Sequence, residues 1–228
     1  MAAPAASGTI IVVTGGDPVD RAVLGSLPTS AVVIAADSGI GHAQSLGLAI
    51  DVAVGDFDSV DPADLARAEQ AGALIERHPE AKDATDLELA LDVALTRQPE
   101  RVIVVGGGGG RLDHLLANAV LLASPAYAAV GLVAHMGPAT VTVVRREAAL
   151  SGPPGDVVSL LAVHGAARRV TATGLLYPLH GEDLLPGSTR GVSNELVAAP
   201  AVVRLDDGVL LAVQPGHIGT HHLKGTSS

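Results

Sequence analysis

The sequence contains no cysteine and no tryptophan, and aromatic side chains make up only 1% of its 228 residues. Without cysteine, the protein has no disulfide, no thiolate metal ligand and no thiol nucleophile. Without large aromatic rings, its core has to be built from Ala, Val and Leu, and a hydrophobic content of 48% is enough for a sizeable core. The length suits one large domain or two small ones.

Basic residues are also few, since 14 Lys and Arg stand against 24 Asp and Glu, for a net charge of −10. Such a charge argues against a nucleic acid or an anionic membrane as the partner. It leaves a phosphate ligand open, because metal ions and backbone amides offset charge locally.

Long uninterrupted apolar runs are missing as well. The most apolar long window, residues 115–134, is broken by Asn118, Ser124 and Pro125, so it predicts a helix followed by a strand and not a membrane span. Residues 1–8 lack the basic segment of a signal peptide. We therefore expect a protein of the cytoplasm.

Up to about residue 136, short apolar runs alternate with segments of helical pattern. The runs typical of parallel strands buried on both faces are 9–14, 31–36, 50–55 and 101–105. Two of the helices between these runs have clear start signals. Asp61 caps one of them, with Pro62 as its first residue, and Thr85 caps another in a capping box with Glu88. This alternation predicts a mainly parallel α/β domain over residues 1–136.

Beyond residue 136 the pattern changes to alternating strands separated by Gly, Pro and Ser. The strands expected there are 140–146, 156–163, 169–173, 201–205 and 209–213. Asp207-Gly208 is typical of a hairpin turn between the last two. We predict a small antiparallel β-sandwich domain over residues 137–228. His217, His221 and His222 lie in its tail, where a frayed terminus is a better interpretation than a metal site.

Asp56 and Asp58 follow the strand at 50–55 directly. If the backbone stays extended through Phe57, the two carboxylates point to the same side. Like charges this close favour a bound cation, and a hard ion such as Mg²⁺ suits oxygen ligands. A simple turn is the alternative, because Asp and Ser are common turn formers.

The glycine-rich stretch 106–110 joins a strand to a helix, which is the layout that presents backbone N–H groups to phosphate. Its spacing fits neither a Walker A loop nor GxGxxG. Arg111 beside it suits bidentate phosphate contact, and His114 and Asn118 are neighbours on the following helix. A glycine turn that binds nothing and a histidine that merely starts the helix remain alternatives.

Lys82, Asp83 and Asp86 cluster at the start of the helix that Thr85 caps. A helix N-terminus favours anionic groups, so Asp86 has a structural interpretation as a dipole partner. That interpretation does not explain Lys82 and Asp83. Because ligands bind beyond the carboxyl ends of parallel strands, we expect Asp37, the acidic pair and the glycine stretch at one shared edge.

Six segments together resemble the thiamine pyrophosphokinase family in order and spacing. They are ADSG at 36–39, GDFDS at 55–59, KDATDLELA at 82–90, GRLDH at 110–114, GLLYPL at 174–179 and GVSNE at 191–195. The last two are similar to that family's thiamine-binding β domain. The resemblance spans about residues 30–213, and six motifs in register are far more specific than any one of them.

This resemblance implies transfer of a pyrophosphoryl group from ATP to the hydroxyl of thiamine, giving thiamine diphosphate and AMP. It implies Mg²⁺ held by Asp56, Asp58 and Asp86, with Asp37 or Asp86 accepting the hydroxyl proton. The other residues implied on the nucleotide side are Ser59, Lys82, Asp83, Thr85, Gly110, Arg111, Asp113, His114 and Asn118. Those implied on the thiamine side are Tyr177, Ser193 and Asn194. It also implies a homodimer that binds thiamine between the α/β domain of one subunit and the β domain of the other.

Tyr177 stands where some relatives have tryptophan, and Leu176 stands where lysine is common. A tyrosine ring still stacks on a cationic thiazolium. Two other functions stay open. A pyrophosphokinase for another alcohol, such as a hydroxymethyl-pterin, would share the acidic cluster without needing Ser193 and Asn194. A non-enzymatic nucleotide-binding module would need fewer of the acidic residues.

Overall fold

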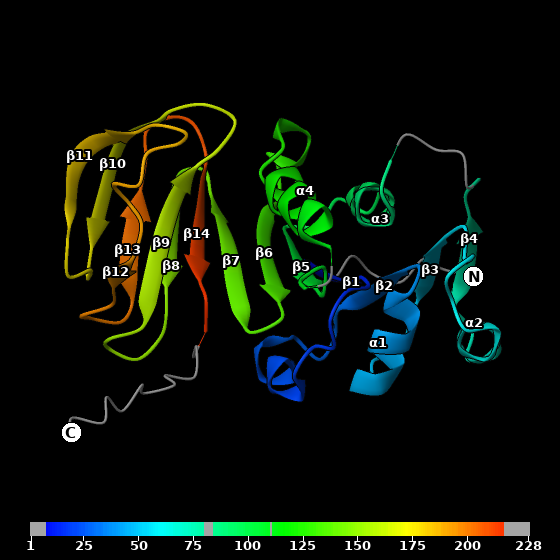
Figure 1. Cartoon of the computed structure of the whole chain (residues 1–228). Helices are drawn as coiled ribbons and strands as arrows, with labels where there is room; N and C mark the ends of the chain where they lie inside the picture. Colours follow the sequence, from blue (N-terminus) through cyan, green and yellow to red (C-terminus); the bar gives the residue numbers. More distant parts are fainter. Residues whose placement is uncertain (1–7, 80–83, 110, 217–228) are drawn as a thin grey trace, which may run out of the picture.

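The computed structural model describes residues 8–79, 84–109 and 111–216. Within these residues a ten-stranded sheet runs in the order β12-β9-β14-β7-β6-β5-β1-β2-β3-β4, and a four-stranded sheet runs β11-β10-β13-β8 (Figure 1). The predicted Lys82, Asp83 and Gly110, and the histidines of the C-terminal tail, lie outside the described residues.

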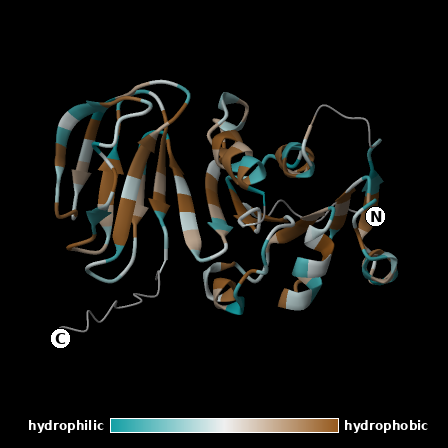
Figure 2. Ribbon diagram, in the orientation of Figure 1, coloured by the Kyte–Doolittle hydropathy of each residue, from teal (hydrophilic) through white to brown (hydrophobic). Residues whose placement is uncertain are grey.

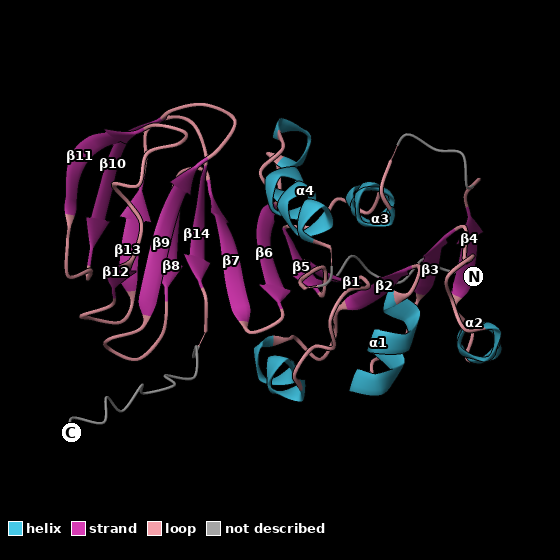
Figure 3. Cartoon of the chain, viewed as in Figure 1, coloured by secondary structure: helices cyan, strands magenta, loops and turns pink. Residues whose placement is uncertain are grey.

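The first half of the chain forms the parallel part of the large sheet. Its strands are β1 (Thr9–Val13), β2 (Val32–Ala36), β3 (Val52–Gly55), β4 (Leu74–Arg77), β5 (Arg101–Val105) and β6 (Gly131–Met136). Its helices are η1 (Arg21–Ser26), α1 (Gly39–Leu46), α2 (Pro62–Gln70), α3 (Asp86–Leu95), α4 (Leu112–Leu122) and η2 (Pro125–Tyr127). Figure 3 shows the helices confined to this half, as the alternation of the sequence predicts.

Two hydrophobic cores cover the two faces of the parallel strands. Because neighbouring side chains alternate across a strand, Ile10 and Val12 of β1 pack with α3, whereas Ile11 and Val13 pack with α1. In Figure 1 α3 and α4 lie on one face, and η1, α1 and α2 on the other. Figure 2 shows the strands between these layers as hydrophobic along most of their length, as burial on both faces requires.

The predicted helix starts are confirmed. The Thr85 hydroxyl accepts the Glu88 amide at 3.2 Å, and Asp61 accepts the Ala63 amide at 2.8 Å ahead of Pro62. An N-cap of this kind contributes about 1 kcal/mol to a helix. Thr85 thereby fixes where α3 begins, and with it the position of Asp86 at the sheet edge.

The second half of the chain contains strands and loops. Its strands are β7 (Ala139–Val144), β8 (Glu147–Leu150), β9 (Val157–Ala162), β10 (Ala167–Thr173), β11 (Leu179–Leu184), β12 (Asn194–Glu195), β13 (Ala201–Arg204) and β14 (Leu210–Gln214). β7, β14, β9 and β12 extend the large sheet antiparallel, and the small sheet packs against them over an aliphatic core. The predicted fold class, α/β followed by an antiparallel sandwich, is confirmed.

The predicted hairpin at Asp207-Gly208 is wrong. β13 pairs with β8 and β10 in the small sheet, whereas β14 pairs with β7 and β9 in the large one. The turn therefore carries the chain from one sheet to the other. It is held by Arg168 at the start of β10, whose amide donates to the Asp207 carbonyl at 2.8 Å.

The large sheet continues through the proposed domain boundary. β6 pairs with β5 in parallel and with β7 antiparallel, and the Gly137-Pro138 turn joins β6 to β7. The division at residue 136 therefore falls in a tight turn within one sheet, and two separate domains stay a prediction. Every helix in the described part of the chain is too short or too polar to span a membrane.

Candidate functional site

A pocket of about 390 Å³ opens at the carboxyl ends of the parallel strands. It lies at the end of β1, which has β2 on one side and β5 on the other. The strand order therefore reverses at β1, because β2 to β4 extend the sheet to one side and β5 and β6 extend it to the other. Open α/β sheets bind ligands at such a point. The lining comes from the loops after β1, β2 and β5, from the starts of α3 and α4, and from Ser59.

Three carboxylates gather at one side of this edge. Asp37, Asp56 and Asp58 each place a carboxylate oxygen within 4.8 Å of the others. Asp37 is only 6% exposed, and the Ser59 hydroxyl donates to its Oδ2. Among the described residues, the buried Oδ1 of Asp37 has no hydrogen-bond partner. A buried carboxylate oxygen without a donor is costly, so this oxygen is suited to a cation.

The route by which these carboxylates meet differs from the expected one. β3 ends at Gly55, and Phe57 adopts a left-handed φ of 63°, so the backbone is not extended from Asp56 to Asp58. The assumption of an extended path is therefore wrong. Instead Gly55 lets Asp37 approach closely, since a Cβ there would lie 3.2 Å from the Asp37 Cβ.

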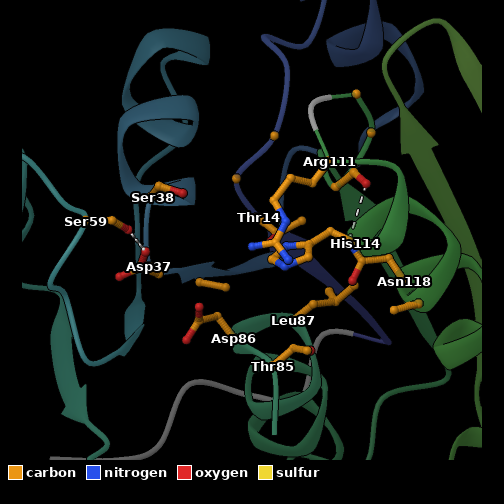
Figure 4. A pocket seen from close by; sticks show the side chains of 17 residues that line it. Thr14, Asp37, Ser38, Ser59, Thr85, Asp86, Leu87, Arg111, His114 and Asn118 are labelled. Carbon is orange, nitrogen blue, oxygen red and sulfur yellow. Dashed lines mark hydrogen bonds between the residues drawn. The ribbon is translucent and has the colours of Figure 1, made fainter. Parts of the chain in front are cut away.

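Asp86 lies at the start of α3 and lines the same pocket. Figure 4 shows its side chain and that of Asp37 on the same side of the cavity. It is not a member of the three-carboxylate group, so its role as a metal ligand stays a prediction. Thr85 and Leu87 line the pocket beside it.

The opposite side of the pocket is built from the glycine loop and the start of α4. Gly107 has a φ of 74°, and a Cβ there would meet Asn118 Nδ2 at 3.1 Å. Asn118 donates to the Gly107 carbonyl at 3.3 Å and so ties the loop to α4. Arg111 and His114 project into the pocket from the same helix start, opposite Asp37 and Asp86 (Figure 4).

Arg111 also forms a bidentate pair with Asp113, at 3.1 Å from Nε to Oδ1 and 2.6 Å from Nη2 to Oδ2. The hydrogen bonds from Arg111 lower the pKa of the exposed Asp113 carboxyl to about 2. Asp113 does not line the pocket itself. It holds the guanidinium at the rim, where a phosphate would compete for the same donors.

The residues predicted on the thiamine side lie in the other half of the chain, and none of them lines this pocket. Tyr177 is 59% exposed. Asn194 is only 4% exposed, and its side chain accepts from the Tyr177 amide at 2.9 Å and donates to the Tyr177 carbonyl at 2.7 Å. The Asn194 amide group is thus committed to holding the Tyr177 loop. Ser193 is exposed beside it, with a left-handed φ of 56°.

Several lining residues were missed from the sequence. They are Thr14, Gly15, Gly16, Ala36, Ser38, Leu87 and Ala117. Thr14-Gly15-Gly16 follows a buried strand directly, so the rule that places ligands beyond strand ends would have found it. Leu87 and Ala117 carry no such signal, because apolar helix residues are ordinarily core.

Two protein-family models match the chain. One is described as thiamin pyrophosphokinase, catalytic domain, and covers residues 26–133. The other is described as thiamin pyrophosphokinase, vitamin B1 binding domain, and covers residues 129–210. A thiamine pyrophosphokinase of Bacillus subtilis (strain 168) is 30% identical over 195 residues, which are 79% of this chain and 86% of that protein.

Solved structures agree with these matches. Thiamine pyrophosphokinase from Bacillus subtilis superposes with a TM-score of 0.81 at 28% identity, covering 92% of this chain and 100% of that one. The enzyme from Geobacillus thermodenitrificans gives 0.77 at 27% identity, covering 92% and 99%. Together the matches confirm the family, the enzyme class and the fold predicted from the six segments. The chain belongs to the thiamine pyrophosphokinase family.

Proposed function

We propose that this chain transfers the pyrophosphoryl group of ATP to the hydroxyl of thiamine, with Mg²⁺ and with the residues described above. The thiamine oxygen forms a bond to the β-phosphorus of ATP while the bond from that phosphorus to the α,β-bridging oxygen breaks, and AMP leaves. The observation that carries the site assignment is the opposition within one pocket of Arg111 and His114 to Asp37 and Asp86.

The acidic group fits a hard divalent cation. Its donors are carboxylate oxygens, and the buried Asp37 Oδ1 has no partner among the described residues. Asp37, Asp56 and Asp58 would hold the ion, which, when bound, neutralises charge on the phosphates. With Asp37 in this group, we assign Asp86 as the carboxylate that accepts the proton from the thiamine hydroxyl.

The chain's own groups supply the remaining phosphate contacts. Arg111 offers a planar pair of donors, and the glycine loop and the starts of α3 and α4 offer backbone N–H groups. Phosphoryl-type transfer depends on positioning and on charge neutralisation, and it needs no covalent intermediate on the protein. These groups therefore account for the phosphate side of the reaction.

We also infer a homodimer, in which residues 137–228 of one subunit bring Tyr177 and Ser193 to the pocket of the other. Within one chain, the strands next to these residues lie at the far end of the sheet from the pocket (Figure 1). Two exposed apolar surfaces support the pairing. One is Leu112, Leu116 and Val120 on α4, and the other is Leu176, Tyr177 and Val192. A cytoplasmic location belongs to the same proposal.

Product analysis tests this function. Purified protein with Mg-ATP and thiamine should release AMP and thiamine diphosphate in equal amounts. ADP with thiamine monophosphate, or the absence of turnover over a range of metals and pH, would contradict it. Other alcohols, including a hydroxymethyl-pterin, are tested in parallel as acceptors. A preference for one of them would show that thiamine is not the acceptor, and it would not affect the proposed nucleotide site.

A further inference from the structure

Helix α4 has less apolar contact with the sheet than α3, the other long helix on that face. Of the residues of α4, all of which the structure describes, only Leu122 is buried. The buried residues of α3 are Leu87, Ala90, Leu91 and Ala94. Apolar packing therefore fixes α4 weakly, although the start of α4 brings Arg111 and His114 to the pocket at the strand ends (Figure 4).

Two side chains from the antiparallel half bind the other end of α4. Arg145, between β7 and β8, donates from Nη2 to the carbonyls of Ala123 and Ser124 at 2.9 and 2.7 Å. His164, between β9 and β10, donates from Nε2 to the Val120 carbonyl at 3.0 Å. Carbonyls at a helix C-terminus have no partner within the helix, and the helix dipole favours a cation there. These polar contacts therefore anchor the C-terminal end of α4.

Both anchoring residues are held in states that are unfavourable by themselves. The Nε atom of Arg145 is buried and has no hydrogen-bond partner among the described residues, and burial lowers the pKa of its guanidinium. His164 adopts a left-handed φ of 56°, which is uncommon for a residue with a side chain. The hydrogen bonds to α4 offset these costs, so the anchor is a specific contact and not a chance meeting of surface groups.

The position of the anchored end determines the position of the pocket end, because α4 is one continuous helix of 11 residues. A helix of that length is about 16 Å long, so a tilt of about 10° at one end displaces the other end by roughly 3 Å. A displacement of about 1 Å already impairs a catalytic site. Asn118 would carry the glycine loop along, since it donates to the Gly107 carbonyl at 3.3 Å.

We propose that Arg145 is a positioning residue of the nucleotide site. It holds α4 by its C-terminal end and thereby keeps Arg111 and His114 in place across the pocket, with His164 as a second and weaker anchor. Arg145 itself touches no substrate and acts through α4. This inference rests on the proposed function, which assigns Arg111 to the phosphates of ATP. The antiparallel half thus supports the nucleotide site of its own chain.

The chain offers matched variants for this test. Arg145→Met removes the donors but keeps an unbranched stem. Arg145→Lys should restore the anchor, because one nitrogen makes both hydrogen bonds and a lysine ammonium also donates from one nitrogen. Arg146→Met is the control, since the neighbouring Arg146 donates to the Asp206 carbonyl at 2.8 Å within the antiparallel half. His164→Asn removes the second anchor and still suits a left-handed backbone.

Calorimetry on the full chain measures equilibrium binding of Mg-ATP, and melting temperatures check that each variant folds. Arg145→Met should raise the Kd of Mg-ATP by about tenfold, because the phosphate donors are misplaced. Arg145→Lys and Arg146→Met should stay within about twofold of wild type. An unchanged Kd in folded Arg145→Met, or an equal rise in Arg146→Met, would overturn the proposal.

His164→Asn keeps the test decisive if Arg145→Met does not fold, because His164 is exposed and its loss leaves the core intact. It should raise the Kd of Mg-ATP by about threefold and speed hydrogen exchange at the amides of α4. A normal Kd together with normal exchange would show that the C-terminal contacts do not position α4, and would overturn the proposal.

A double-mutant cycle asks whether Arg145 acts through Arg111. In an Arg111→Gln background, Arg145→Met should raise the Kd of Mg-ATP by only about twofold, because the main donor that it positions is already gone. Equal factors in the two backgrounds would indicate a general loosening of the fold and would refute the positioning role.

The two proposals fail separately. If wild-type protein forms no thiamine diphosphate yet Arg145→Met selectively weakens Mg-ATP binding, the acceptor assignment is wrong and the positioning role stands. If wild-type protein forms thiamine diphosphate and folded Arg145→Met binds Mg-ATP normally, the positioning role is wrong and the function stands.

Discussion

The parallel half of the chain, from β1 to β6, and the antiparallel half, from β7 to β14, place their charged side chains differently. In the parallel half, Asp37, Asp86 and Arg111 face a common pocket at the strand ends. Surface ion pairs occur there too, as in Arg67–Asp64 and Arg111–Asp113. In the antiparallel half, no described residue lines that pocket, and charges pair with each other on the surface. The pairs are Arg168–Asp183, Arg169–Asp206, Arg190–Glu182 and Arg204–Glu147.

This difference follows from the topology. Parallel strands bring loops from distant parts of the sequence to one edge, so unlike charges converge on a space that suits a ligand. The antiparallel strands carry their charges on a solvated face, where each pair contributes little to stability. What the antiparallel half offers a ligand is exposed apolar surface around Tyr177. We therefore expect catalysis to depend on the first half and acceptor binding on the second.

The largest effect is expected from Asp56→Asn in the parallel half. It removes one charge from the group of three carboxylates, so turnover should fall by about a hundredfold or more. Without ligand, stability should be unchanged or slightly higher, because like charges repel less. Thermal melts with and without Mg-ATP should show that the variant loses most of the stabilisation that the ligand gives to wild type.

Asp51→Asn is the control for that prediction. Asp51 accepts the Val33 amide at 2.8 Å and takes no part in the acidic group, so its replacement should lower the melting temperature but keep the Mg-ATP shift. If Asp56→Asn behaved like this control, Asp56 and Asp58 would form a structural turn. The assignment of catalysis to the parallel half would then lose its main support.

Tyr177→Ala tests the antiparallel half. Loss of the ring should raise the thiamine KM by about tenfold and leave the ATP KM nearly unchanged. Tyr177→Phe should keep most of the affinity for thiamine, because its ring still stacks on a cation. Steady-state kinetics with each substrate varied would measure the difference. Equal changes in both KM values would contradict the assignment of acceptor binding to this half.

Subunit mixing sharpens the same test. If each site draws on both subunits, a mixture of Asp56→Asn and Tyr177→Ala proteins should regain about a quarter of wild-type activity at low thiamine, because half of the dimers are mixed and each holds one intact site. A mixture no more active than the average of its two components would place the whole site in a single chain.

Variants of Asn194 and Ser193 should distinguish a residue that holds the Tyr177 loop in place from one that contacts thiamine. Asn194→Ala leaves the Tyr177 amide and carbonyl without partners and should destabilise the fold by about 1–3 kcal/mol, together with a higher thiamine KM. Ser193→Ala should raise the thiamine KM at nearly constant stability. Urea unfolding and kinetics on both variants provide the measurement, and a stable Asn194→Ala with normal kinetics would exclude the supporting role.

The smallest effect concerns Asp113. Arg111 lowers the pKa of its carboxyl to about 2, so the charged form is favoured in the folded state. The stabilisation from this pair is present above the ordinary pKa of Asp and is lost as the pH falls through about 2. NMR titration should show the midpoint rising toward its ordinary value in Arg111→Gln, and also in wild type when ATP draws Arg111 away. An unchanged midpoint in Arg111→Gln would refute the pairing.

The sequence by itself determined the strands of the parallel half, the helix starts at Asp61 and Thr85, and the residue types at the strand ends. These depend on contacts within a few residues, such as the hydroxyl of Thr85 on the amide of Glu88. The six motifs also determined the family, because each keeps its local spacing. Short strands such as β11 were missed, because the LHGEDL of β11 carries few β-branched or aromatic residues.

The strand pattern also placed Asp37, the acidic pair and the glycine stretch at one edge of the sheet, but only the tertiary structure decided which side chains make contact there. It joined Asp37 to Asp56 and Asp58 through a left-handed Phe57, and it committed the side chain of Asn194 to the backbone of Tyr177. It also separated β13 from β14 into different sheets and set Arg145 against the end of α4. Each of these outcomes rests on contacts between segments far apart in the chain. Such contacts are set by the packing of whole strands and helices, and the local pattern of residues does not encode them.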